Sequence, residues 1–271
     1  MRKHLTNKEK TRLDDFFGAF AAARNPLLLL DYDGTLAPFR VDRYQARPWA
    51  GVSELLTRIQ EEGRTRVVVI TGRPAAEIPP LLQVRPAPEV WGLHGAERIH
   101  LNGRRELDQP PPAMRGKLEE LNAELRRAAL GGLFEEKANA AVMHWRGMPP
   151  QKAKVIEKRT RELFEPLVRM YGLTMLEFEA GLELRAGPEK GDAVRALLEE
   201  TNASQPAAYL GDDLTDETAF RAIKGRGLGI LVRRERRASA AEIWLRPPEE
   251  LRNFLRRWLR SCRPVPERLR A

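Results

Sequence analysis

The side chains best suited to chemistry begin with two carboxylates, Asp31 and Asp33, which follow the apolar run at 27–30. Side chains two apart on an extended segment point to the same side, and Gly34 permits a sharp turn after them. Two carboxylates at one site repel each other unless a cation or a shared proton offsets their charge. The pair therefore suggests a Mg²⁺ site, although a solvated turn explains it equally well when it is taken alone.

Groups that suit a phosphate follow two later elements. Thr71, Gly72 and Arg73 come after the apolar run at 67–70 and offer a hydroxyl, an approachable backbone amide and a guanidinium. Lys190 stands at the head of an expected helix, where the ammonium charge and the helix dipole both favour an anion. A plain strand-to-helix turn and a surface lysine are the structural alternatives.

The densest acidic cluster is the segment 211–217, GDDLTDE, which directly follows the apolar run at 207–210. Several acids at the end of a strand are costly without a cation, and oxygen-only ligands select a hard ion such as Mg²⁺. An acidic helix N-terminus is the alternative, and it partly explains the presence of Asp216 and Glu217. The segment is too dense for capping to explain all of it.

These segments need a scaffold that brings the ends of several strands together. Helical or mixed sequence separates the short continuous apolar runs at 27–30, 67–70, 90–93, 207–210 and 228–232. This alternation predicts an α/β fold with a Rossmann-like parallel sheet, helices on both faces, and ligand sites where the strands end. A capping box of Thr6 and Glu9 opens a first helix, and a last helix at 251–258 packs on the core before a loose tail.

The texture of the sequence changes between residues 108 and 187, after a run of three prolines. This block predicts a small α+β domain inserted into a catalytic core formed by residues 1–107 and 188–271.

Within the block, the alternating stretch 134–145 predicts an antiparallel strand, and a long helix is expected at 152–171. The expected buried face of that helix carries Ile156, Leu163 and Leu167.

Composition favours a globular protein, with 42% hydrophobic and 31% charged residues. No apolar run approaches the roughly 18 residues that a membrane span needs, and the charged start lacks the apolar stretch of a secretory signal. The single cysteine, Cys262, forms no intrachain disulfide and is expected to be inert packing, which fits a cytoplasmic location. The net charge of +9 attracts polyanions, but acids alternate with the bases along helices and no aromatic-studded basic patch indicates nucleic acid.

Taken in order, the four segments resemble the motifs of the haloacid-dehalogenase superfamily of phosphatases. The resemblance implies that Asp31 attacks phosphorus and that Asp33 acts as general acid and base. It implies that Thr71 and Lys190 hold the phosphoryl oxygens. The Mg²⁺ site that it implies comprises Asp31, the backbone carbonyl of Asp33 and Asp212, with Asp213 and Asp216 in support.

Longer motifs look like those of the trehalose-6-phosphate phosphatase family within this superfamily. They are DYDGTLAP at 31–38, TGR at 71–73, GLHGAE at 92–97, Glu135 with Lys137, HWR at 144–146, Glu183 to Arg185, Lys190 with Gly191, and GDDLTDETAF at 211–220. The family implies that the inserted block is a cap that closes over the sugar. The candidate substrate-binding residues are then Gly72, Arg73, His94, Glu135, Lys137, Arg146 and Glu183.

Alternatives remain for several of these residues. Glu135, Lys137 and Arg146 also suit an exposed strand face, and His94 could bond backbone near the hinge as readily as contact sugar. His144 is expected to be structural. Rival functions are hydrolysis of another sugar phosphate, of the sucrose 6-phosphate or mannosyl-3-phosphoglycerate type, and non-catalytic phosphosugar binding. The expected partner is a small sugar phosphate, and the resemblance also allows a trehalose-6-phosphate synthase, for which the chain carries no motif.

Overall fold

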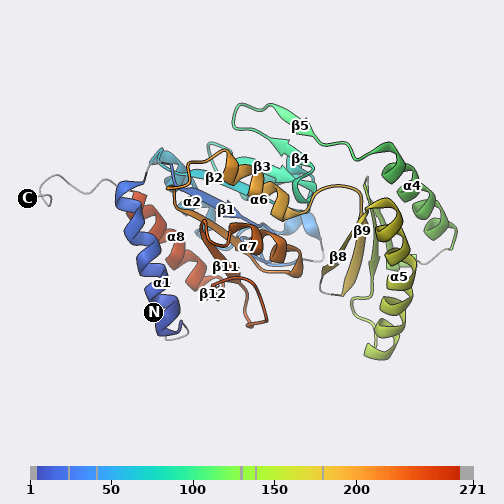
Figure 1. Cartoon of the computed structure of the whole chain (residues 1–271). Helices are drawn as coiled ribbons and strands as arrows, with labels where there is room; N and C mark the ends of the chain where they lie inside the picture. The colour runs from blue at the N-terminus through green and yellow to red at the C-terminus, as the bar shows by residue number, and fades with distance from the viewer. Residues whose placement is uncertain are drawn as a thin grey trace, which may run out of the picture. The chain divides into compact units, whose positions relative to one another are not determined.

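The structure is a computed structural model that describes residues 5–262, except 24, 41, 129, 130, 138 and 179 (Figure 1). Its larger sheet has eight strands in the order β12-β11-β10-β1-β2-β3-β4-β5. These strands are β1 Leu27–Leu30, β2 Arg66–Ile70, β3 Glu89–Gly92, β4 Glu97–Ile99, β5 Arg105–Leu107, β10 Ala207–Gly211, β11 Leu228–Val232 and β12 Ile243–Leu245.

Six neighbouring strands of this sheet, from β12 to β3, run parallel, while β4 pairs antiparallel with β3. The predicted α/β fold with a parallel sheet is therefore confirmed. The expectation did not include β4, β5 and β12, which have three residues each. Strands this short carry too few side chains for a period of two to stand out from the surrounding sequence.

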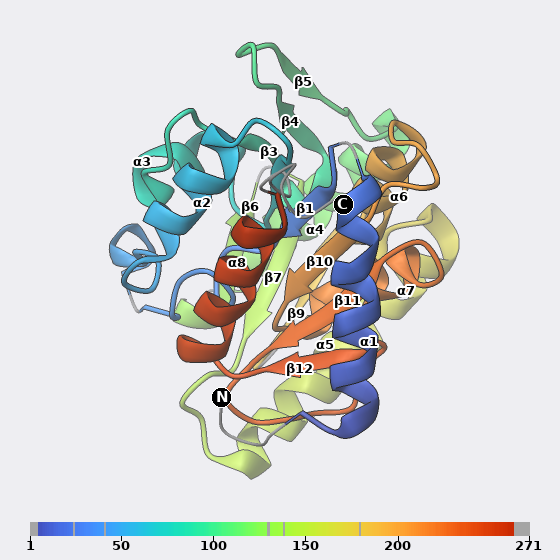
Figure 2. The same cartoon turned by 90° about the vertical axis from the view of Figure 1, so that its left-hand side faces the viewer.

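Helices cover both faces of the sheet (Figure 2). Successive side chains of a strand point to opposite faces, so neighbouring residues of β1 pack with different helices. Leu28 and Leu30 pack with one set of helices, and Leu27 and Leu29 pack with the other. The first set is α1 Asn7–Gly18, α2 Val52–Glu61, α3 Ile78–Leu82 and α8 Glu249–Cys262, and the second is α6 Lys190–Glu199 and α7 Glu217–Ile223. Short 3-10 helices lie at η1 Ala19–Ala22, η2 Arg43–Gln45, η3 Ala75–Glu77, η4 Leu93–Gly95, η5 Gly131–Leu133 and η6 Leu214–Asp216.

The first and last helices meet in an aromatic cluster. Helix α1 begins with the predicted capping box, in which Thr6 Oγ1 accepts from the Glu9 amide at 3.2 Å and the Thr6 amide donates to Glu9 Oε2 at 2.8 Å. Phe20 of the following turn stacks edge-on against Trp258 of α8 with ring centroids 4.7 Å apart. The predicted packing of the last helix is confirmed. Cys262 is buried, and burial raises the pKa of its thiol. The expected tail, 263–271, lies outside the described residues.

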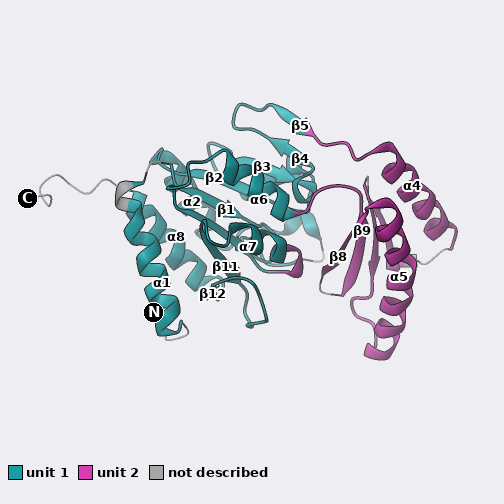
Figure 3. Ribbon diagram, viewed as in Figure 1, with its two compact units in different colours: residues 1–106, 190–212, 216–271 teal, residues 107–189, 213–215 magenta. Residues whose placement is uncertain are grey.

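The chain divides into two compact units (Figure 3). Unit 1 comprises Met1–Glu106, Lys190–Asp212 and Asp216–Ala271, and unit 2 comprises Leu107–Glu189 with Asp213–Thr215. None of the helices in the described ranges combines the length and the apolar character that crossing a membrane requires.

Unit 2 is built on a four-stranded antiparallel sheet in the order β6-β7-β9-β8, against which two helices pack. Its elements are α4 Pro112–Arg127, β6 Phe134–Lys137, β7 Ala140–His144, α5 Pro150–Tyr171, β8 Thr174–Phe178 and β9 Gly181–Arg185.

Two expectations for unit 2 were wrong. The stretch 134–145 is not one strand but two, β6 and β7, paired in register from Phe134↔Met143 to Lys137↔Ala140. The strand-like sequence pattern continues across the short connection between β6 and β7, so the pattern alone does not show where one strand ends and the next begins. Leu163 of α5 is 39% exposed, whereas Phe164 is fully buried and Leu167 is only 8% exposed. The helix is rotated so that positions 160, 164 and 167 form its buried stripe.

Candidate active site

Three of the predicted segments lie side by side because they follow adjacent parallel strands. Strand β1 lies between β10 and β2, and Leu30 is in register with Leu210 on one side and Val69 on the other. Asp31 therefore follows β1 between the ends of its neighbours, and its amide donates to the Leu210 carbonyl at 2.8 Å. The carboxyl edge of the sheet is the expected place for a ligand site.

Two glycines allow the acidic segments to approach each other closely. Gly34 has a φ of 86°, and a Cβ there would lie 2.0 Å from Asp212 Oδ2. A Cβ on Gly211 would lie 2.5 Å from Asp216 Cγ. Any larger residue at either position would push a carboxylate out of the site, so both glycines are required by close contact, and Gly34 is also required by its positive φ.

Lys190 joins the segments electrostatically. Its Nζ donates to Asp31 Oδ1 and to Asp216 Oδ1, each at 2.7 Å, and all three side chains are at most 4% exposed. Burial acts to lower the pKa of Lys190, but the charges of Asp216 and Asp31 outweigh it, and the pKa is raised. Lys190 is therefore a fixed positive charge at the head of α6.

The two carboxylate oxygens of Asp31 have different surroundings. Burial raises the pKa of its carboxyl to about 7, against the opposing effect of Lys190. Asp31 Oδ1 accepts from Lys190, while the buried Oδ2 has no hydrogen-bond partner among the described residues. A buried carboxylate oxygen of this kind is costly unless a ligand engages it.

A cation fits this position. Carboxylate oxygens of Asp31, Asp212 and Asp216 lie within 4.8 Å of one another, and all three residues are buried. Asp216 is already engaged, because Oδ1 accepts from Lys190 and from the Tyr209 hydroxyl at 2.5 Å and Oδ2 accepts from the Asp212 amide at 2.9 Å. The open oxygen of Asp31 beside Asp212 suits a hard ion with oxygen ligands. Within the described ranges, the cluster does not include Asp213.

The Asp33 carboxylate lies in a clamp formed by Arg73. The Arg73 Nε and Nη2 donate to Asp33 Oδ2 and Oδ1, each at 2.6 Å, and Nη1 lies 3.5 Å from Glu77 Oε2. The guanidinium also lies over the Tyr32 ring, 5.6 Å from its centroid. Arg73 was expected to offer its guanidinium to a phosphate, but the structure places it on Asp33. Such a two-bond contact fixes the carboxylate in orientation as well as position.

The other residues that were expected to face a phosphate also lie close together. Thr71 Oγ1 accepts from the Arg73 amide at 3.2 Å, and the Thr71 carbonyl accepts from the His94 amide at 2.9 Å. A Cβ on Gly72 would lie 2.6 Å from His94 Nε2, so the imidazole packs directly on the Gly72 backbone. The TGR and GLHGAE motifs thus meet at the same edge as Asp31.

Unit 2 carries the other candidates on one face of its sheet. Strand register places Glu135 and Glu183 on either side of Val142, and the next row holds Lys137 and Arg185. Lys137 Nζ donates to Glu183 Oε2 at 2.8 Å, and His144 Nε2 lies 2.9 Å from Glu135 Oε2. The opposite face of the sheet carries apolar residues of the unit 2 core, including Ala141, Met143 and Leu184. Arg146 is exposed just beyond the end of β7.

The sequence analysis assigned no role to three residues that shape these groups, although one of them, Arg185, lies within a quoted motif. Tyr209 bonds Asp216, but within an apolar run it had the appearance of core packing. Arg237 donates to the Asp212 carbonyl from Nη2 at 3.3 Å and also contacts Glu217. Its basic surroundings, 233–237, indicated only a solvated surface. Arg185 is 2% exposed beside Glu183, and its place two residues later on the same strand was the available signal.

The strand order, with acidic segments and a lysine at the carboxyl edge, is that of the haloacid-dehalogenase-like class. A haloacid dehalogenase-like hydrolase from Bacteroides thetaiotaomicron shares this fold with a TM-score of 0.60 at 18% identity, over 86% of this chain and 99% of that one. The chain belongs to the trehalose-phosphatase family, whose model matches residues 29–246.

Individual relatives agree with this family. A trehalose-phosphate phosphatase from Mycobacterium avium is 29% identical over 87% of this chain, which spans only 62% of that protein's length. A bifunctional trehalose-6-phosphate synthase/phosphatase from Thermoproteus tenax is 31% identical over 81% of this chain and 30% of its own. The C-terminal domain of Candida albicans trehalose-6-phosphate phosphatase has the same fold, with a TM-score of 0.74 at 20% identity over 93% and 97% of the two chains.

The Arg73 clamp leads to a prediction that separates orientation of Asp33 from phosphate binding. Arg73→Lys keeps the charge but cannot form two parallel hydrogen bonds. We expect kcat for hydrolysis of a phosphate monoester to fall roughly 10-fold or more with little change in KM, because one charge-assisted contact to Asp33 is lost. Steady-state kinetics beside the exposed control Arg85→Lys provide the measurement. A raised KM at unchanged kcat would instead make Arg73 a phosphate ligand.

Proposed function

We propose that this chain is a Mg²⁺-dependent phosphatase that hydrolyses trehalose 6-phosphate to trehalose and phosphate, the last step of trehalose synthesis. The observation that carries the proposal is the buried Asp31 carboxylate, held at one oxygen by Lys190 and open at the other beside Asp212. Membership of the trehalose-phosphatase family and the names of the relatives support the substrate.

The proposed reaction has two steps. Asp31 Oδ2 attacks phosphorus, the bond from phosphorus to the sugar oxygen breaks, and protonated Asp33 gives that oxygen its proton. Asp33, now a carboxylate, then takes a proton from water, whose oxygen attacks the phospho-aspartate and releases phosphate and Asp31. The two hydrogen bonds from Arg73 fix the orientation of Asp33 as a carboxylate, the form that takes the proton from water in the second step.

Repulsion between the anionic nucleophile and the anionic phosphate must be offset. Lys190 and Thr71 would hold phosphoryl oxygens, with Lys190 supplying a charge already fixed by Asp216. Mg²⁺ held by Asp31, the Asp33 carbonyl and Asp212 would neutralise charge on the transferred group. Asp216 and Asp213 belong to the proposed support of this site, and for Asp216 the hydrogen bond from the Asp212 amide gives the support a physical basis.

Sugar recognition is assigned to unit 2. The charged row of Glu135, Lys137 and Glu183, with Arg146 near its end, presents carboxylates and cations that suit the hydroxyls of a disaccharide. His94, packed on Gly72, is proposed to contact substrate from the phosphate side. The cytoplasm, which suits the single cysteine, is the proposed location, and a synthase is the proposed source of the substrate, as in the two-activity relative.

The nucleophile has a direct test. Asp31→Asn should abolish phosphate release, because the amide is a poor nucleophile, while its near-identical shape and the remaining bond between Lys190 and Asp216 preserve the fold. Release of phosphate from trehalose 6-phosphate and a thermal melt are measured together, with Asp14→Asn on the surface as control. Near-normal turnover in Asp31→Asn would disprove the covalent mechanism.

The metal is tested by chelation. EDTA should silence the enzyme and added Mg²⁺ restore it, because Asp31 Oδ2, which accepts no hydrogen bond among the described residues, lies in a cluster of buried carboxylates with Asp212 that suits a hard cation. The assay is phosphate release before chelation, after it and after metal is returned. Full activity after exhaustive chelation would remove the ion from the mechanism.

Sugar recognition predicts an unequal effect on two substrates. Glu135→Ala or Lys137→Ala should lower kcat/KM for trehalose 6-phosphate by roughly 10-fold or more, about the cost of one lost polar contact. Hydrolysis of p-nitrophenyl phosphate should change much less, because that substrate has no sugar. Glu136→Ala, at the exposed neighbouring position, is the matched control. Equal losses on both substrates would contradict the assignment.

A panel of sugar phosphates tests the substrate itself. Trehalose 6-phosphate should be preferred over sucrose 6-phosphate, mannosyl-3-phosphoglycerate and glucose 6-phosphate, and preference for another member would replace the proposed substrate. The panel tests the substrate directly, because one fold can serve different sugar phosphates and also non-catalytic binding.

A further inference from the structure

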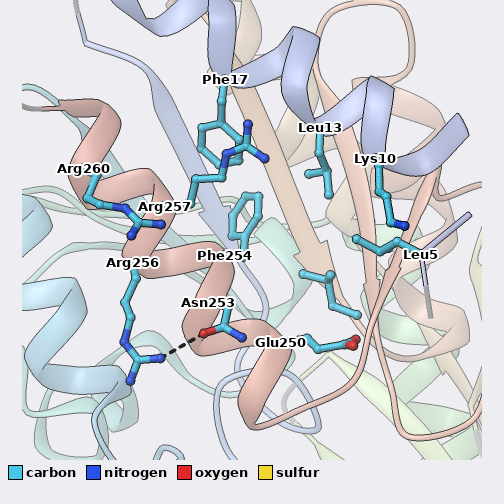
Figure 4. A pocket seen from close by; sticks show the side chains of 11 residues that line it. Leu5, Lys10, Leu13, Phe17, Glu250, Asn253, Phe254, Arg256, Arg257 and Arg260 are labelled. Atoms are coloured by element: carbon cyan, nitrogen blue, oxygen red, sulfur yellow. Dashed lines mark hydrogen bonds between the residues drawn. The ribbon is translucent and has the colours of Figure 1, made fainter. Parts of the chain in front are cut away.

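A groove that no step of the proposed reaction uses lies between helices α1 and α8 of unit 1 (Figure 4). Its volume is about 310 Å³, which lies within the range of small-molecule sites. The floor is apolar and comes from three elements: Leu13 and Phe17 of α1, Phe254 of α8 and Leu245 of β12. None of the proposed catalytic or sugar-binding residues lines it.

The floor is preformed rather than a loose gap. Phe17 and Phe254 pack with ring centroids 5.5 Å apart, and both rings contact Trp258, at 6.3 and 5.9 Å. Trp258 is fully buried, so the rings rest on a fixed base. The groove therefore keeps its shape without a ligand, which reduces the cost of binding one.

The rim of the groove is basic. Lys10, Arg256 and Arg260 line it, and none of them has an acidic partner among the residues that the structure describes. Arg257, between them, is different: its Nη2 pairs with Asp14 at 2.7 Å and its guanidinium covers the Phe17 ring at 4.4 Å. Three cations beside one apolar floor are left to attract an anion.

One acid also lines the groove but does not neutralise this rim. Glu250 Oε2 accepts from the Arg246 amide at 2.7 Å, which caps the start of α8. This hydrogen bond holds the carboxylate at the helix terminus without removing its charge, and the basic residues that line the groove outnumber this one acid, so the balance of charge remains positive.

We propose that this groove binds a small amphipathic anion, an unbranched acyl chain that ends in a carboxylate. The chain would lie on the rings of Phe17 and Phe254, and the carboxylate would meet the basic rim. The proposal is independent of the catalytic assignment, because the site shares no residue with it.

Charge argues against two other occupants of the groove, a terminal segment of this chain and a second copy of the chain. The segments nearest in sequence, 1–4 and 263–271, carry Arg2 and Lys3 and, in the second, three arginines against one glutamate. Their charge has the same sign as the rim. A second copy of a chain with net charge +9 would face the same repulsion.

The test is a titration of the full chain with decanoate below its micelle concentration, followed by calorimetry. We expect one saturable site per chain, weaker binding of decanol, and no binding of decyltrimethylammonium, since only decanoate satisfies both the floor and the rim. Binding should weaken as salt is added, because the rim charges are exposed. Tryptophan fluorescence should respond, because Trp258 contacts both rings of the floor.

Three variants locate the site. Lys10→Gln combined with Arg260→Gln should weaken decanoate binding about 5-fold, the effect of two exposed charge pairs. Asn253→Trp, at an exposed position on the groove, should block the site without altering the core. Arg226→Gln, an exposed arginine elsewhere in unit 1, should bind decanoate as the parent does. Phosphatase activity should be retained in all three.

Several results would overturn the proposal. Equal binding of decanol or of the cationic amphiphile would show that the rim does not select anions. Unchanged decanoate binding in both groove variants would place the site elsewhere. Binding to anionic vesicles without binding to free decanoate would indicate a membrane surface, and self-association lost in Asn253→Trp would indicate a second copy.

Discussion

A single buried ammonium group, that of Lys190, is the contact on which the arrangement of the active site depends. It lies between Asp31 and Asp216, which follow different strands, and without it two carboxylates would be buried uncompensated. Removing one member of such a buried set costs far more than the set contributes as a whole, because the remaining charges lose their partner. The site is therefore constrained from three segments at once, and Gly34 and Gly211 provide the space that this closeness requires.

The sequence allowed much of the fold and site to be predicted, because the governing signals are local. Continuous apolar runs mark strands buried on both faces, and the carboxyl ends of parallel strands bring Asp31, Thr71 and Asp212 to one edge. Resemblance to a known family then supplied roles that spacing alone leaves open. The agreement extends to the family that the comparisons identify.

What could not be predicted depends on geometry between segments. The partner of Arg73 is Asp33 because a loop and a strand end meet there, and a motif does not specify which acceptor a guanidinium reaches. Leu163 and Phe164 are neighbours in one helix, and only the rotation of α5 against its sheet decides which is buried. Arg237 contacts Asp212 from a basic run whose composition is that of an ordinary surface.

The packing of α1 against α8 has a consequence for synthesis of the chain. The core of unit 1 needs residues from both helices, from Leu13 to Trp258, so it stays incomplete until nearly all of the described chain has left the ribosome. Most of unit 2 is one continuous stretch, Leu107–Glu189, and can bury its own core earlier. During translation the first half of the sheet, including β1 to β3, is therefore synthesised while its apolar faces are still uncovered. In this period the chain is most prone to aggregate and chaperone binding is most useful.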